Sequence, residues 1–72
     1  MNELTRKQMD VLEYITRFKE VNGYSPSIRE IASGTYTGST PIHTLLEELK
    51  DKGYITYKPR QPRTIRVIKF IA

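Results

Sequence analysis

The chain has no cysteine, only one histidine, and no apolar stretch long enough to cross a membrane. Without cysteine it can form neither a disulfide nor a thiolate metal site, which fits a reducing compartment. His43 has no second histidine or cysteine to complete a ligand set, so we expect no metal and no other cofactor. Because no segment resembles a signal peptide or a transmembrane helix, we predict a cytoplasmic protein without a membrane partner.

Acidic residues are missing from the C-terminal end of the sequence. Residues 52–72 contain six lysines and arginines and no acid, whereas residues 1–51 contain six basic and eight acidic residues. The net charge of the whole chain is +4. Basic charge gathered at one end indicates a local site for a polyanion rather than general solubility. The alternative is a solvated hairpin that is basic by chance.

Patterns typical of enzymes are also missing. The sequence has no Ser/His/Asp set, no pair of carboxylates placed for acid–base chemistry, no phosphate-binding loop and no cluster of metal ligands. A chain of 72 residues has room for one small domain, residues 1–72, of modest stability. We therefore predict a single binding domain and no enzymatic activity.

Two capping boxes predict the first two helices. Thr5 and Gln8 have the spacing at which an N-cap hydroxyl and a side chain three residues later exchange hydrogen bonds, and so do Ser27 and Glu30. The first helix is expected to end near Asn22-Gly23. The second is a short helix, followed by a turn over residues 33–38.

A third helix is predicted from a proline, a glycine and an apolar period of 3.6 residues. Thr40 is the expected N-cap, Pro41 the first helical residue and Gly53 the left-handed residue that ends the helix. The apolar stripe consists of Ile42, Leu45, Leu46 and Leu49. Short polar groups stay exposed near the start of this helix, as in helices that read the major groove.

After Gly53 the apolar period changes from 3.6 to 2. Ile55 and Tyr57, and later Ile65 and Val67, alternate with polar residues, and two prolines lie in the segment 59–63 between them. This pattern predicts a β-hairpin with arginines at its tip. The fold class predicted is mainly α with a small β-hairpin, a three-helix winged helix-turn-helix.

Three segments carry a resemblance to a known family. Residues 22–31 read NGYSPSIREI, residues 52–55 read KGYI, and residues 62–67 read PRTIRV. In this order they resemble the N-terminal DNA-binding domain of LexA repressors, from about residue 3 to residue 68. The resemblance implies a repressor of the SOS type, or of a phage or mobile element. Such a protein binds double-stranded DNA in the bacterial nucleoid, usually as a homodimer on a palindromic operator.

The resemblance also implies which residues meet the DNA. The third helix enters the major groove, the second lies against the DNA backbone, and the wing over residues 58–63 contacts the backbone or the minor groove. The positions that face base edges in this family correspond to Ser39, Thr40, Pro41, His43 and Thr44, and those of the second helix to Ser27 and Arg29. The family's self-cleavage domain, with its serine–lysine pair, is expected to be absent.

For several of these residues two interpretations stay open on the sequence alone. His43 and Thr44 either contact bases or belong to a solvated helix surface, and Thr40 either contacts a base or only caps the helix. Glu47 either accepts from a cytosine amino group or pairs with a lysine of its own helix. Arg29 either contacts a phosphate or pairs with an acid of the first helix.

The remaining candidates are expected to contact the DNA backbone. They are Tyr36 in the turn before the third helix, Lys52 at the end of that helix, and Lys58, Arg60 and Arg63 in the wing. Lys52 has the alternative role of complementing the helix dipole. The competing function is a winged-helix module that binds an acidic protein, because Glu47 and Glu48 make the third helix less cationic than expected.

Overall fold

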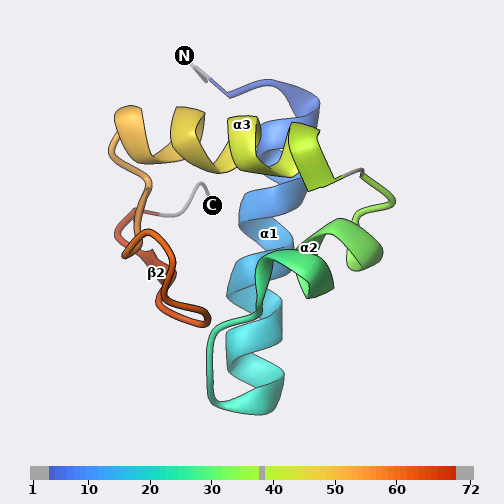
Figure 1. Cartoon of the computed structure of the whole chain (residues 1–72), viewed down its shortest axis with the longest axis vertical. Coiled ribbons are helices and arrows are strands. Elements are labelled where there is room, and N and C mark those ends of the chain that lie inside the picture. Colours follow the sequence, from blue (N-terminus) through green and yellow to red (C-terminus); the bar gives the residue numbers. More distant parts are fainter. Residues whose placement is uncertain (1–3, 38, 70–72) are drawn as a thin grey trace.

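Three helices and a short hairpin follow one another in a computed structural model that describes residues 4–37 and 39–69; of Ser39 and Thr40 it describes the backbone only. The elements are α1 (Arg6–Asn22), α2 (Ile28–Gly34), α3 (Ser39–Asp51), β1 (Ile55–Thr56) and β2 (Arg66–Val67). Figure 1 shows α3 lying across α1, with α2 beside both and the hairpin following the C-terminal end of α3. The predicted winged helix-turn-helix is confirmed.

Both predicted capping boxes are present. At α1 the Gln8 backbone N–H donates to Thr5 Oγ1 at 3.2 Å, and the Thr5 N–H donates to Gln8 Oε1 at 2.9 Å. At α2 the Glu30 N–H donates to Ser27 Oγ at 3.1 Å, and the Ser27 N–H donates to Glu30 Oε1 at 2.8 Å. Each exchange satisfies backbone donors that a helix start leaves unpaired.

The start of α3 differs from the prediction. The helix begins at Ser39, so Thr40 is its second residue rather than its N-cap, and Pro41 is its third residue. Proline is tolerated at this position because the first four N–H groups of a helix have no acceptor within it. The turn before α3 is also shorter than predicted, since α2 continues to Gly34. Gly38, the residue before α3, lies outside the described residues.

The predicted end of α3 at Gly53 is confirmed. Gly53 has φ +84°, its N–H donates to the Lys50 carbonyl, and the Tyr54 N–H donates to the Leu49 carbonyl, both at 3.0 Å. These two bonds form a Schellman motif, which pairs carbonyls at the helix end and redirects the chain into β1.

Replacing Gly53 with alanine is expected to destabilise the fold by roughly 1–2 kcal/mol, because a Cβ at positive φ approaches the following carbonyl oxygen. The strain is local to the backbone, since an added Cβ would meet no atom within 4 Å beyond Gly53 itself and its two chain neighbours. Gly53→Asn is the matched variant and should lose less, because asparagine tolerates this conformation better than alanine. Urea unfolding followed by circular dichroism measures both, and equal stability of the alanine variant and the parent would contradict this account.

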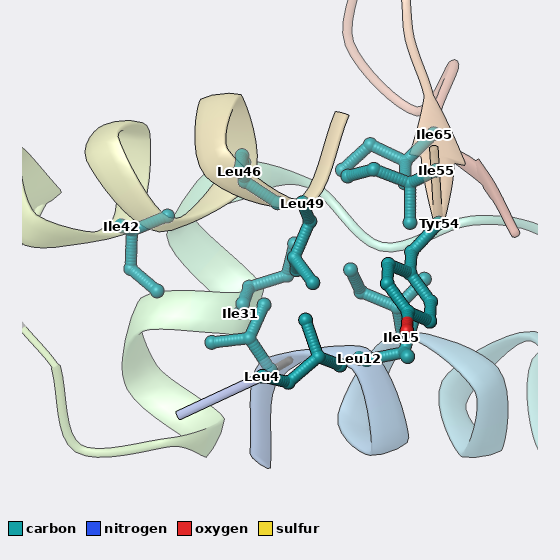
Figure 2. Packing of buried hydrophobic residues seen from close by; sticks show 11 residues of the cluster. Leu4, Leu12, Ile15, Ile31, Ile42, Leu46, Leu49, Tyr54, Ile55 and Ile65 are labelled. Atoms are coloured by element: carbon teal, nitrogen blue, oxygen red, sulfur yellow. The ribbon is translucent and has the colours of Figure 1, made fainter. Parts of the chain in front are cut away.

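The core is formed by side chains from all three helices and the hairpin (Figure 2). Its buried hydrophobic members are Leu4, Val11, Leu12, Ile15, Ile31, Ile42, Leu46, Leu49, Tyr54, Ile55 and Ile65. The predicted stripe of α3 is confirmed, with Leu45 only partly buried. Val21, by contrast, is 82% exposed. It lies in the last turn of α1, which projects beyond α2 and α3 in Figure 1.

The hairpin is antiparallel, with Ile55 opposite Val67 and Thr56 opposite Arg66. Ile55 and Ile65 are buried while Thr56 and Arg66 are exposed, so the predicted alternation is confirmed. The Ser25 hydroxyl, buried just before α2, donates to the Ile65 carbonyl. The hairpin is therefore attached to the segment that precedes α2 as well as to the core.

Candidate nucleic-acid interface

A groove of about 620 Å³ separates the exposed face of α3 from the hairpin loop. Its α3 side carries His43, Glu47 and Lys50, which follow one another at helical spacing along one face. The loop side consists of residues 58–64, and the floor includes Pro26, Ile28, Leu46, Tyr57 and Ile65. The structure thus brings together two predicted sets, the base-facing helix and the wing.

The start of α3 presents its polar surface to solvent. Pro41, His43 and Thr44 are all exposed, as the prediction for a reading helix requires. The side chains of Ser39 and Thr40 lie outside the described residues. An exposed first turn of this kind can approach base edges without first displacing any other part of the protein.

Glu47 and Glu48, which are neighbours in α3, lie in different surroundings. Glu47 lines the groove, whereas Glu48 Oε1 accepts a hydrogen bond from Gln8 Nε2 of α1 at 2.6 Å. Gln8 is buried, and its Oε1 also accepts from Lys52 Nζ at 3.0 Å. Glu48 and Lys52 therefore help to fix α3 on α1. The sequence left two interpretations open for Lys52. The structure adds a third, a side-chain contact with α1.

Charges along the groove are mixed. Lys50 Nζ lies 5.0 Å from the centre of the Tyr57 ring, within the range of a cation–π contact. Burial, followed by the nearby carboxylates of Glu47 and Asp51, raises the pKa of Tyr57. Both effects disfavour the tyrosinate, so the ring stays neutral and adds no charge to a groove that already holds two carboxylates.

The wing is closed by the Thr64 hydroxyl and by a backbone bond from the Gln61 N–H to the Lys58 carbonyl at 3.2 Å. Thr64 Oγ1 accepts from the Lys58 N–H at 3.0 Å and donates to the Gln61 carbonyl at 3.0 Å. Within this loop Arg60 and Arg63 have φ +65° and +61°. For a residue with a Cβ this conformation costs about 1–2 kcal/mol. Lys58 and Arg60 are exposed, so their charges are available to a ligand in the groove or beside it.

Arg63 differs from the other wing cations because it is bound within the protein. Its guanidinium Nη1 lies 2.8 Å from Glu30 Oε1 and donates to the Ser25 carbonyl at 3.2 Å. Nη2 donates to Glu30 Oε2 at 3.3 Å. The Ser27 backbone N–H, followed by Arg63, lowers the pKa of Glu30, and the same carboxylate raises the pKa of Arg63. Nothing local in the sequence indicated this pair.

The candidates outside α3 and the wing are exposed or at the start of a helix. Arg29 is exposed and forms no ion pair with any described residue. Of its two interpretations, pairing with an acid of α1 is therefore not found among these residues. Ser27 is the N-cap of α2. Tyr36, 95% exposed with φ +54°, projects from the turn between α2 and α3. Lys7 Nζ holds this turn on α1 by donating to Thr37 Oγ1 at 3.1 Å.

Residues 4–37 and 39–69 offer neither a cluster of metal ligands nor a membrane-spanning helix. No group of three or more histidine, cysteine, aspartate or glutamate residues is placed to hold a metal ion. No helix in that part of the chain is long and apolar enough to span a bilayer.

Comparison with known families gives a match over most of the chain. The model of the LexA DNA binding domain matches residues 1–64, which include all three helices and the loop of the wing. This chain belongs to the LexA DNA-binding domain family. The resemblance seen in its sequence motifs is thereby confirmed.

Individual LexA repressors are similar over nearly the whole of this chain. That of Thermosipho africanus is 44% identical over 69 residues, which are 96% of this chain and 35% of the repressor. That of Staphylococcus epidermidis is 38% identical over 69 residues, 94% of this chain and 34% of the repressor. The Staphylococcus aureus protein is equally similar, at 38% identity. The chain spans about a third of the length of the LexA repressors it matches.

Proposed function

We propose that this chain binds double-stranded DNA at specific sequences and acts as the DNA-binding part of a transcriptional repressor. The observation that carries the proposal is the groove between the exposed face of α3 and the cationic wing, in a member of the LexA DNA-binding domain family. The relatives that it matches are LexA repressors. From the same comparison we further propose a role in the SOS response, or in a phage or mobile element. We also propose a location at the nucleoid in the cytoplasm.

In this proposal each part of the site contacts a different part of the duplex. The first turns of α3 enter the major groove, which is about 12 Å wide and admits a helix. The groove in the protein then receives the sugar–phosphate backbone beside it, and Lys58 and Arg60 reach phosphates or an adjacent narrow minor groove. Arg29, Ser27 and Tyr36 contact the backbone on the other side. Specificity comes from α3 and most of the affinity from phosphate contacts.

The two glutamates now enter this proposal differently. Glu47, in the groove, can accept from a cytosine amino group, whereas Glu48 is bonded to Gln8 and belongs to the support of α3. We further propose that two copies bind a palindromic operator, because two-fold symmetry in the protein pairs with two-fold symmetry in the site.

Selection of bound duplexes from a random pool, followed by sequencing, tests the function directly. The expected result is one enriched half-site, repeated in inverted orientation at a fixed spacing. Failure to enrich any sequence, together with capture of an acidic protein by the same domain, would favour the competing function of a protein-binding module. Enrichment of an unpaired half-site would keep DNA binding and reject the dimer.

Replacing His43 with alanine is expected to relax the preference at one base position and leave the others unchanged. A specific base contact is worth roughly 1–3 kcal/mol of discrimination, about 5- to 150-fold in preference. His43 is exposed and lines the groove, so its loss should not disturb the core. Repeating the duplex selection with the variant measures the effect, and an unaltered base preference at every position would remove His43 from the reading set.

A further inference from the structure

The guanidinium of Arg63 is held from three sides. Both of its terminal nitrogens lie against the two carboxylate oxygens of Glu30, at 2.8 and 3.3 Å. Nη1 also donates to the Ser25 carbonyl, and the group lies 4.9 Å from the centre of the Tyr24 ring. This two-point contact uses the planar fork of arginine, which a lysine ammonium cannot reproduce.

Glu30 in turn joins two parts of the proposed interface. Its Oε1 accepts from the Ser27 N–H in the capping box of α2 and from Arg63 in the wing. One carboxylate therefore connects the start of α2 with the hairpin loop, 33 residues later in the chain. Ser25, which precedes α2, adds a second connection through its hydroxyl and the Ile65 carbonyl.

We propose that Glu30 and Arg63 are positioning residues that fix the hairpin loop against the start of α2, and that Arg63 itself neutralises no phosphate. The pair sets where Lys58 and Arg60 meet the DNA. This inference rests on the proposed function, because it assigns a role within DNA binding to a residue that the sequence motifs place among the DNA contacts.

Arg60 provides the matched comparison. It lies in the same loop and has nearly the same φ, +65° against +61° for Arg63. Yet Arg60 is exposed and has no ion pair with any of the residues described. The two arginines therefore differ in function although they share residue type, loop and a positive φ.

The dependence of DNA affinity on salt separates these roles. Each neutralised phosphate contributes about −0.9 to the slope of log K against log salt concentration. Replacing Arg60 with glutamine should therefore flatten the slope by about 0.9. Arg63→Gln should leave the slope unchanged and weaken binding by roughly fivefold at every salt concentration, the order expected for losing an exposed but bidentate ion pair. Arg63→Lys keeps the charge but loses the fork, so it should behave like Arg63→Gln.

Glu30→Gln tests the other partner. Glutamine at this position preserves the capping box, so the variant removes the ion pair while keeping the start of α2. It should weaken DNA binding by the same roughly fivefold factor, and the double variant with Arg63→Gln should be no weaker than either single one. Tighter binding by Glu30→Gln, or a slope flattened by about 0.9 in Arg63→Gln, would show that Arg63 contacts phosphate and would overturn the inference.

A measurement without DNA distinguishes failure of this inference from failure of the proposed function. Nuclear magnetic resonance titration of the Glu30 carboxyl should give a pKa below its ordinary value in the parent, because the Ser27 N–H and Arg63 both stabilise the carboxylate. The pKa should rise in Arg63→Gln, and the Lys58 and Arg60 amide signals should shift. An unchanged Glu30 pKa would refute the pair, whereas a parent that binds no duplex would refute the function alone.

Discussion

Replacing Leu49 with alanine is expected to remove a large part of the stability of this domain. Leu49 is fully buried in the last turns of α3, in the cluster that joins α1, α3 and the hairpin. Removing a buried leucine side chain costs about 2–5 kcal/mol, from lost burial and from the cavity left behind. Small domains lie toward the low end of the usual stability of about 5–15 kcal/mol, so this loss takes between about two fifths and all of a stability near 5 kcal/mol.

Urea unfolding followed by circular dichroism measures the effect as a lower midpoint with an unchanged slope. Val21→Ala is the control, because it truncates an aliphatic residue that is 82% exposed and should change stability by no more than about 0.5 kcal/mol. Equal midpoints for Leu49→Ala and Val21→Ala would mean that α3 is not held by the core described. DNA binding by Leu49→Ala should fall in proportion to its folded fraction, since Leu49 lies away from the groove lining.

Much of the fold is predictable because its signals are local. A capping box involves two residues three positions apart, so Thr5 with Gln8 and Ser27 with Glu30 identify helix starts without any knowledge of the tertiary structure. The end of α3 is equally local, since it depends on Gly53 and its neighbours. The alternation in the hairpin needs only a buried face and an exposed face.

The start of α3 shows where local signals stop being decisive. Pro41 lacks the N–H that a helix interior would use, but every residue of the first turn can do without it. A proline therefore indicates the start of a helix only to within a few residues, and does not determine which of them is the first. Threonine is also a favourable N-cap residue, so Thr40 favoured a predicted helix start later than the observed one.

Long-range polar pairs account for the part of the candidate site that the sequence did not reveal. Arg63 and Glu30 lie 33 positions apart, and Gln8 and Glu48 lie 40 apart. No periodicity or motif spacing relates such residues, because their proximity depends on how the hairpin and α1 pack against the other helices. The exposure of His43, Pro41 and Arg60 depends only on the surface of one helix or one loop, and all three are exposed. Their contact with DNA stays a prediction.

The distribution of charge predicts that the wing contributes most of the electrostatic affinity for DNA. Glu47 and Asp51 line the groove on its α3 side, where they repel a phosphate backbone, and Lys50 is turned toward the Tyr57 ring. The α3 side therefore contributes little net attraction. In the proposed complex we therefore expect phosphate neutralisation to fall to the exposed cations at the rim, above all Lys58 and Arg60 in the wing.

DNA affinity is consequently expected to fall steeply with salt. If each protomer neutralises roughly four to six phosphates, the slope of log K against log salt is about −4 to −5 per protomer. Raising monovalent salt from about 50 to about 200 mM should then weaken binding by roughly 250- to 1000-fold per protomer. Fluorescence anisotropy with a labelled duplex, titrated at several salt concentrations, measures this slope.

The double variant Lys58→Gln/Arg60→Gln locates the source of that dependence. It should flatten the slope by roughly 2 while leaving the preferred sequence unchanged, because phosphate contacts carry no base information. Arg66→Gln is the control, because it also replaces a cation of the hairpin by glutamine. Arg66 is exposed on β2 and lies outside the groove lining. A parent slope near zero would reject the electrostatic part of the proposal. A flattening by about 0.9 in Arg66→Gln, equal per charge removed, would instead assign the attraction to the overall charge of the hairpin, not to the residues at the rim of the groove.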